Sequence, residues 1–474
     1  MNINNWLKKN SLLNSAIWYT IGTFILKGVN FFTTPIFSRL LSTDDYGVVT
    51  IYSTWTAIVS ILIGMGINGT VGSAKANLDE NEYSEYLSST LFLGTISFLF
   101  VILGTLIFRE SLKNVLGLNS YIIILLVFES FFSFVISFVT SIFTFNRNHK
   151  MYLLTSTVTT AINIVVSILL ILYLESERFI GKIVGGALAT ILVGLVLYIK
   201  VILKGKRLIS LKHWRFCLPI AIPLIFHNLS HLVLNQADKI MIQKIIDQSA
   251  VGVYGMVYNI SAIINVIQLA LNSAWMPWYF EMLKQDKEHE ISRTASIYIG
   301  VFTALTAMFI LGSTEVMKIF TGREYWSGIP LMPIIIVGYY FVFLYTFPAN
   351  YQFYIKQTKF IAIGTVLAAI CNIVINLFLI PKIGIYGAAI STLIAYVILF
   401  LMHQAIMRCK YKHIDFSFRF NIVGVIGVAL SGILSYLFSD YFIIRWSIIV
   451  IIIVTIGILI MKNMKESNGR ENNK

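Results

Sequence analysis

The chain of 474 residues is 57% hydrophobic and only 12% charged, and its net charge is +14. Soluble domains carry roughly 25% charged residues, so the composition excludes a soluble globular protein. It is typical of an all-α integral membrane protein. The positive charge needs no nucleic-acid partner to explain it, because Lys and Arg gather in the inner loops of membrane proteins.

Apolar windows of about 20 residues predict about 14 transmembrane helices. We expect no cleavable signal peptide, because the first window is a full-length span without a small-residue cleavage site. The predicted spans are 15–37, 46–67, 87–108, 120–145, 152–174, 180–201, 216–237, 250–273, 294–313, 328–348, 359–380, 385–405, 420–438 and 445–462.

The first predicted helix carries a lysine, Lys27, in the middle of GTFILKGVNFF (22–32). Lys27 lies roughly 18 Å of helix from either end of the apolar stretch, which is too deep for its ammonium group to reach the headgroups. A charge at this depth costs about 2.5–3.5 kcal/mol. Polar residues spaced by three or four positions share its helical face, which must therefore contact other helices or water. They are Tyr19, Thr23, Lys27, Asn30, Thr34 and Ser38.

The fourth predicted helix contains one deep acid, Glu129. Three interpretations are open. Lys27 and Glu129 form an ion pair that only locks the helices, or Lys27 binds an anion, or Glu129 carries protons for energy coupling. The next turn, FNRNHKMY, carries Arg147 and Lys150, which are either ordinary inner-face anchors or substrate contacts.

Positive charge is densest in KVILKGKRLISLKHWR (200–215), which has six Lys and Arg residues and no acid. The positive-inside rule places this loop and both termini in the cytoplasm. Arg215 lies at the inner mouth of the seventh helix, and Lys356 and Lys359 follow the tenth. For these three residues, anchoring at the inner face and substrate contact are again the two interpretations.

Helices 7 and 8 carry polar rows of their own. For the small polar side chains, hydrogen bonding between helices is the alternative interpretation. Lys27 and the two histidines favour a water-filled cavity, because charge and imidazole are costly in a bilayer. Asp238, next to Lys239, is interpreted as a surface pair or as a coupling residue. The rows are His227, His231, Asn235, Lys239 and Gln243 on helix 7, and Ser261, Asn265, Gln268 and Asn272 on helix 8.

The two halves of the sequence repeat at an offset of about 200 residues. Residues 39–62 align without gaps on 244–267, which pairs Arg39 with Lys244 and Gly47 with Gly252. NIVVSILLI (163–171) resembles NIVINLFLI (372–380). The repeat predicts two pseudo-twofold-related six-helix lobes, 1–205 and 206–412, with a cavity between them. Residues 413–474 then form two additional helices and a cytoplasmic tail.

The sequence contains no phosphate loop, metal-ligand cluster or nucleophile elbow. The three cysteines, Cys217, Cys371 and Cys409, have no metal or disulfide spacing. We therefore expect a protein without catalytic residues, metal or cofactor.

Three segments resemble bacterial polysaccharide transporters: TPIFSRLLSTDDYGVVTIY, QADKIMIQKIIDQSAVGVYGMVYNI and NLFLIPKIGIYGAAISTLIAY. These proteins are O-antigen, capsule and related repeat-unit flippases. They belong to the superfamily of multidrug, oligosaccharidyl-lipid and polysaccharide exporters. The resemblance covers nearly the whole chain and implies two six-helix lobes with two added helices.

The resemblance also implies the function. The substrate would be an undecaprenyl-diphosphate-linked oligosaccharide, moved to the outer leaflet of the bacterial plasma membrane for surface polysaccharide synthesis. Polysaccharide polymerase and glycosyltransferases would be partners. A cationic cavity would use Lys27, Arg39, Lys239 and Lys244, and roughly two negative charges on a diphosphate suit Lys and Arg.

Two kinds of alternative remain. A cation-coupled multidrug exporter of the same superfamily commonly places an acid in its first helix, where this chain has Lys27. A lipid II flippase of the same superfamily is the second transporter among the alternatives. A membrane-embedded polysaccharide polymerase or ligase would usually need a long outer loop, and no loop here exceeds about 20 residues.

Overall fold

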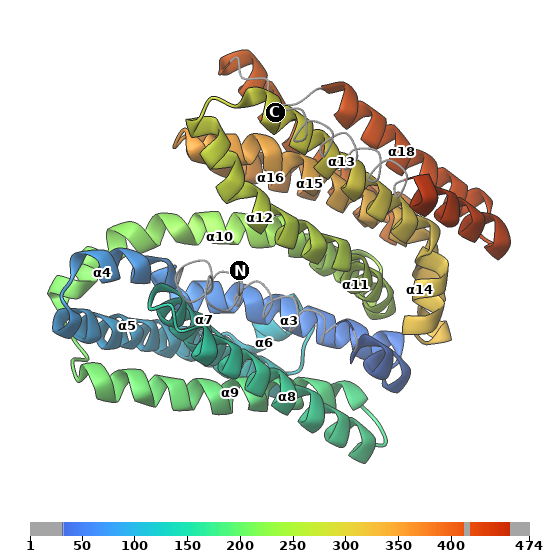
Figure 1. Cartoon of the computed structure of the whole chain (residues 1–474). Helices are drawn as coiled ribbons and strands as arrows, with labels where there is room; N and C mark the ends of the chain where they lie inside the picture. Colours follow the sequence, from blue (N-terminus) through green and yellow to red (C-terminus); the bar gives the residue numbers. More distant parts are fainter. Residues whose placement is uncertain (1–30, 32, 412–417, 456–474) are drawn as a thin grey trace. The chain divides into compact units, whose positions relative to one another are not determined.

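The computed structural model describes residues 31, 33–411 and 418–455, and every regular element in these ranges is a helix. The predicted all-α fold is confirmed. The chain divides into two compact units, Met1–Gly255 and Met256–Lys474 (Figure 1).

The first unit contains five long helices that correspond to predicted spans 2 to 6, followed by the long helix α10. A short 3-10 helix, η1 (Ile67–Thr70), connects α3 to α4. The α-helices are α3 (Thr43–Gly64), α4 (Val71–Asn77), α5 (Glu80–Ile107), α6 (Arg109–Leu116), α7 (Ser120–Phe145), α8 (His149–Tyr173), α9 (Arg178–Gly205), α10 (Leu211–Ile245) and α11 (Gln248–Ser261), whose end crosses into the second unit.

In the second unit, as in the first, a long helix is followed by a short helix and then by three more long helices. Its elements are α12 (Ile263–Lys284), α13 (Glu288–Leu311), α14 (Ser313–Phe320), η2 (Arg323–Leu331), α15 (Met332–Tyr354), α16 (Lys359–Ile383), α17 (Ile385–Ala405), the π-helix η3 (Ile406–Lys410), α18 (Phe418–Leu437) and a last helix, Phe442–Thr455. The short helices α6 and α14 occupy equivalent places in this order.

Ten helices of the described part are long and apolar enough to cross a membrane, or 11 if the bent α10 is one span. The predicted spans 13 and 14 correspond to the shorter apolar helices Asn421–Leu437 and Phe442–Thr455. The first predicted span, 15–37, lies mostly outside the described residues. The chain is thus a multi-pass membrane protein, and the predicted number of 14 spans is not confirmed.

Helix α10 belongs to the first unit and packs against α3 and α5, although the sequence repeat assigns it to the second lobe. Trp214 Nε1 donates to the Ser89 carbonyl of α5 at 3.1 Å, and Thr54 of α3 donates to Gln236 at 3.3 Å. These contacts explain why the compact units divide after Gly255. The predicted lobe boundary between residues 205 and 206 stays a prediction.

Helices α3 and α11 cross at two glycine contacts that are reciprocal under the sequence repeat. A Cβ on Gly47 would lie 2.0 Å from the Gln248 carbonyl oxygen, and one on Gly252 would lie 1.9 Å from the Thr43 carbonyl oxygen. Residues 43 and 248 are themselves equivalent in the repeat. Such reciprocity marks a local twofold relation between the two helices. Only glycine permits this approach of the two backbones.

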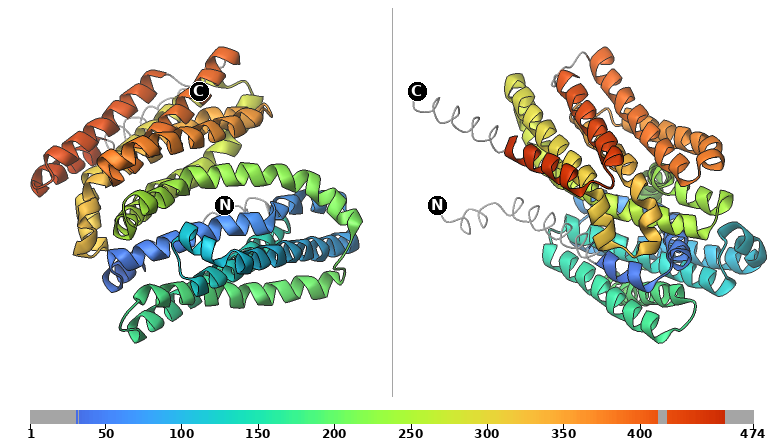
Figure 2. Two further views of the ribbon diagram at one scale, coloured as in Figure 1. Left: turned by 180° about the vertical axis from the view of Figure 1, so that it is seen from behind. Right: turned by 90° about the vertical axis from the view of Figure 1, so that its right-hand side faces the viewer.

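Helix α8 runs along α9, and the views of Figures 1 and 2 both show the pair. A Cβ on Gly181 would lie 2.7 Å from the Ile171 nitrogen, and one on Gly185 would lie 2.6 Å from the Ser167 nitrogen. Small residues let membrane helices pack closely. The pair α16 and α17 uses the same device, because a Cβ on Gly387 would lie 2.5 Å from the Leu379 carbonyl carbon.

The turns after α7 and α15 are also equivalent. Arg147 (φ 56°) and Lys356 (φ 59°) both adopt the left-handed conformation. In both turns the next residue donates its backbone N–H to a carbonyl five residues earlier, Asn148 to Phe143 and Gln357 to Gln352. This bond is typical of the Schellman motif that ends helices. The repeat therefore extends to the geometry of its turns.

A buried ion pair attaches the last helix to α14. Arg445 is 1% exposed, and its guanidinium donates to both carboxylate oxygens of Glu315 at 2.9 and 2.5 Å. It also donates to the carbonyl oxygens of Leu311 and Phe438. A bidentate pair with further acceptors is the arrangement that offsets the cost of burying a guanidinium.

Candidate functional site

The structure gives no side-chain geometry for four of the predicted cavity residues. Lys27 and Asn30 lie outside the described residues. His227 and His231 lie on α10, but their side chains are likewise outside the described part. Their predicted roles stay predictions.

Glu129 is held by two hydroxyl groups from neighbouring helices. The Tyr52 hydroxyl of α3 donates to Glu129 Oε2 at 2.5 Å, and Thr190 Oγ1 of α9 donates to Oε1 at 3.4 Å. Tyr52 is 3% exposed. A carboxylate in an apolar bundle requires such donors. Glu129 therefore connects α3, α7 and α9.

The positive charge that acts on Glu129 in the described part of the chain is Lys182 of α9. Its Nζ donates to Asn163 Oδ1 of α8 at 3.1 Å and lies 3.8 Å from the centre of the Phe37 ring. The two charges do not form a salt bridge within 4.0 Å. We name the set Glu129, Tyr52, Thr190, Lys182 and Asn163 the Glu129 cluster.

A second polar cluster joins α10 to α3 and α11. Lys239 is 7% exposed and donates to Gln236 Oε1 at 2.7 Å, and Thr54 of α3 donates to the same oxygen. Asp238 is 1% exposed and accepts from the Tyr254 hydroxyl at 2.7 Å. The interpretation of Asp238 and Lys239 as a surface pair is wrong, because both side chains are buried.

The repeat-equivalent Arg39 and Lys244 are both exposed. Arg39 Nη1 donates to the Pro35 carbonyl of its own helix at 3.3 Å. Lys244 Nζ donates to the Asn114 carbonyl of α6 at 2.7 Å. Their positive charges remain accessible to solvent, as an anion-binding role would require.

The predicted amide residues lie on α10 and α12. Asn235 of α10 and Asn265 of α12 are partly buried, whereas Gln268 of α12 is 2% exposed. One turn after Gln268, Asn272 Oδ1 accepts from Asn350 Nδ2 of α15 at 2.7 Å. The polar row of α12 thus contacts another helix at that point, in agreement with the hydrogen-bonding alternative.

The predicted inner basic residues share one property: all five side chains are exposed. They lie in helix-connecting turns or in the first turns of helices. They are Arg147, Lys150, Arg215, Lys356 and Lys359.

Sequence reasoning missed Lys182 and Asn163. Lys182 lies near the start of its span, where a lysine is usually an interfacial anchor. The available signal is spacing, since Lys182 and Thr190 are eight residues apart and share a helical face. No group of three His, Cys, Asp or Glu residues able to hold a metal occurs in the described residues.

Comparison with known proteins identifies the family. Residues 12–283 match the family model described as polysaccharide biosynthesis protein. The chain belongs to this family. Among its relatives, the probable low-salt glycan biosynthesis flippase Agl15 of Haloferax volcanii is 21% identical over 432 residues, which cover 89% of each protein.

The fold of the chain is similar to those of two solved transporters. The lipid II flippase MurJ in an inward closed conformation has a TM-score of 0.75 at 16% identity, over 94% of this chain and 99% of MurJ. An inward-facing multidrug resistance MATE family transporter of the MOP superfamily has a TM-score of 0.65 at 14% identity, over 82% and 96%. The family match confirms the predicted resemblance to polysaccharide biosynthesis proteins, and the fold is similar to those of MurJ and the MATE transporter.

Proposed function

We propose that the protein flips an undecaprenyl-diphosphate-linked oligosaccharide repeat unit from the inner to the outer leaflet of a bacterial plasma membrane by alternating access. The product would serve O-antigen, capsule or exopolysaccharide synthesis. The observation that carries the proposal is the family match over residues 12–283, which includes both Lys27 and the buried Lys239.

The charges suit a diphosphate. A diphosphate carries roughly two negative charges, and Lys and Arg are its usual partners. In a low-dielectric cavity the attraction by Lys27 and Lys239 is stronger than in water. Exposed Arg39 and Lys244 would then attract the diphosphate toward the outer end of the path.

The sugar hydroxyls also need partners, because an unpaired polar group is costly away from water. Asn235, Asn265 and Gln268 would supply amide donors and acceptors. The inner basic residues Arg147, Lys150, Arg215, Lys356 and Lys359 would capture the substrate in the cytoplasmic leaflet, with both termini on that side.

Flipping breaks no covalent bond, so the proposed function requires no catalytic residue and no cofactor. Glycosyltransferases must supply the lipid-linked oligosaccharide, and a polymerase or transferase must consume it at the outer face. These enzymes are the proposed partners.

Lys27 provides the test. We expect Lys27→Ala to lower surface glycan by at least tenfold at normal expression, and Lys27→Arg to retain most of it, because arginine keeps the charge. Lys113→Ala, an exposed lysine on α6, is the matched control and should be unaffected. Unchanged surface glycan in the Lys27→Ala strain would exclude the anion-binding role.

A further inference from the structure

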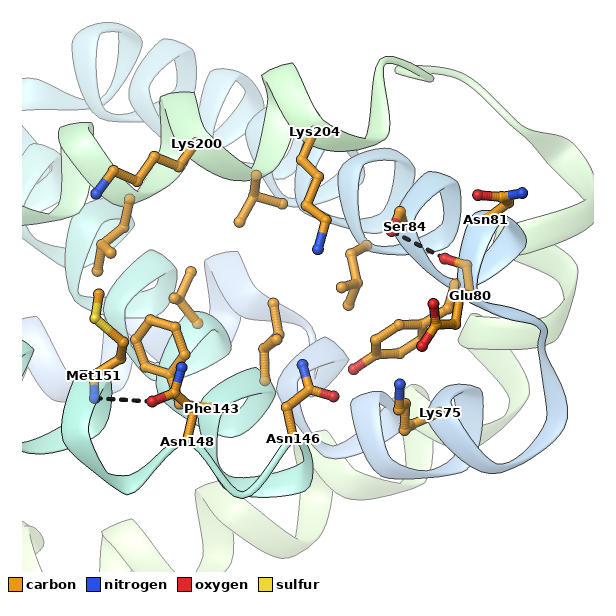
Figure 3. Close-up of a pocket in the computed structure, with 16 residues that line it drawn as sticks. Lys75, Glu80, Asn81, Ser84, Phe143, Asn146, Asn148, Met151, Lys200 and Lys204 are labelled. Carbon is orange, nitrogen blue, oxygen red and sulfur yellow. Dashed lines mark hydrogen bonds between the residues drawn. The ribbon is translucent and has the colours of Figure 1, made fainter.

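A pocket of about 610 Å³ lies in the first unit, among α4, α5, α9 and the turn between α7 and α8. Figure 3 shows Lys200 and Lys204 of α9 on one side of the pocket and Lys75 of α4 on the other, with Lys204 facing Asn146. The pocket lies at the ends of its helices. Its lining includes none of the residues proposed above to contact the transported substrate, although Arg147 and Lys150 are sequence neighbours of the lining residues Asn146, Asn148 and Met151.

The pocket is positively charged. Three lysines line it against one acid, Glu80. Within the described residues, none of the three ammonium groups lies within 4.0 Å of a carboxylate. Lys75 Nζ lies 4.9 Å from the centre of the Tyr83 ring, and this cation–π contact leaves its positive charge in place. This arrangement attracts an anion.

A buried hydroxyl in the lining has no partner. Tyr83 is 4% exposed, and its Oη has no hydrogen-bond partner in the described part of the chain. A buried phenol hydroxyl is costly when it is left unpaired. A ligand with an oxygen acceptor would satisfy it, and this observation is independent of the lysines.

On α5, α7 and α9 the lining runs from a polar residue at one end to an apolar residue at the other. Seven residues, or about 10 Å of helix, separate a polar residue at the rim from an apolar one deeper in the pocket. The pairs are Glu80 and Leu87 on α5, Asn146 and Val139 at the end of α7, and Lys204 and Leu197 on α9. The same gradient on three helices fits an amphiphile and not a soluble anion.

From these observations we infer that the pocket binds the phosphate head group of a lipid in the leaflet that borders the α7–α8 turn. Lys75, Lys200 and Lys204 hold the phosphate, the Tyr83 hydroxyl donates to one of its oxygens, and the hydrocarbon chain lies against Leu87, Val139 and Leu197. Basic pockets between transmembrane helices are known binding places for anionic head groups. The inference goes beyond the proposed transport and does not depend on the transported glycan.

The test uses the purified full chain in detergent, equilibrated with equal amounts of phosphatidylglycerol and phosphatidylcholine that carry the same acyl chains. Mass spectrometry of the intact complexes counts the lipids that each variant retains. We expect the wild-type protein to prefer phosphatidylglycerol, and Lys200→Gln/Lys204→Gln to lose at least fivefold of that preference. Lys206→Gln/Lys284→Gln removes two exposed lysines outside the pocket and should retain it.

Tyr83→Phe removes only the unpaired hydroxyl and should weaken retention at least threefold without changing any charge. A parallel series with undecaprenyl phosphate identifies the source of the head group. If retention of either lipid depends on the lysines, the result supports the proposed pocket. If wild-type and Lys200→Gln/Lys204→Gln protein retain both lipids equally, the result overturns the proposal. Since retention is measured on isolated protein, the outcome is separate from that of the Lys27 transport test.

Discussion

At the scale of single residues, the structure assigns partners to the deep acid. The sequence left open an ion pair between Glu129 and Lys27, and this pair stays a prediction because Lys27 lies outside the described residues. In the described chain Glu129 accepts hydrogen bonds from Tyr52 and Thr190, and the positive charge acting on it is Lys182. Because these residues come from α3, α7 and α9, we propose that the Glu129 cluster mainly stabilises the packing of the first unit.

A double-mutant cycle tests this role. We expect Glu129→Gln and Lys182→Gln to have non-additive effects on the free energy of unfolding in detergent, with a coupling of at least about 1 kcal/mol. Denaturant titration of the two single variants and the double variant measures it. The exposed Arg109–Glu110 pair is the control and should show almost no coupling. Additive effects at Glu129 and Lys182 would contradict the assigned interaction.

The partners of Glu129 could not be predicted, because hydrogen bonds between distant helices depend on rotation and tilt that hydropathy does not encode. The polar row on helix 7 could be predicted from the sequence, since its spacing alone places Asn235 and Lys239 on one face. The burial of Asp238 was missed because an Asp–Lys neighbour pair is common at surfaces. Its partner, Tyr254, lies on another helix.

At the scale of helices, glycine determines how closely neighbours pack. Gly185 and Gly186 are adjacent on α9 but have different surroundings. A Cβ on Gly185 would lie 2.6 Å from the Ser167 backbone nitrogen of α8, whereas one on Gly186 would have its nearest neighbour, Asn163 Nδ2, at 3.7 Å. The first distance requires the helices to separate, and the second is ordinary van der Waals contact.

The two positions give a matched prediction. Gly185→Ala should destabilise the protein by about 1–3 kcal/mol, because overpacking shifts the backbone of α8. Gly186→Ala should be neutral or stabilising by about 0.5–1 kcal/mol, because alanine favours the helix over glycine. Thermal unfolding in detergent compares the two. Equal transition temperatures for both variants would show that α8 and α9 do not approach at Gly185.

Most helices could be predicted from the sequence, because a membrane requires about 20 apolar residues in each span. The short helices α6 and α14 were not predicted, since eight residues are too few for a hydropathy window. The pocket near Lys75 could not be predicted either, because its lysines look like ordinary inner-loop charges until the fold brings them together.

At the scale of the whole molecule, the internal repeat is the strongest prediction from the sequence. It reappears in the order of the helices, in the α3–α11 crossing and in the matching turns at Arg147 and Lys356. Because the family match covers residues 12–283, it includes the first repeat and the start of the second. The proposed central cavity follows from this repeat and from the polar rows, and it stays a prediction.

The most direct test of the proposed function is the leaflet distribution of the lipid-linked oligosaccharide after deletion of the gene. Membrane vesicles of both orientations, probed with an impermeant glycan-modifying reagent, measure it. We predict that the oligosaccharide accumulates in the cytoplasmic leaflet, and that the wild-type chain restores the outer-leaflet pool while Lys27→Ala does not. An outer-leaflet pool unchanged by the deletion would contradict the account.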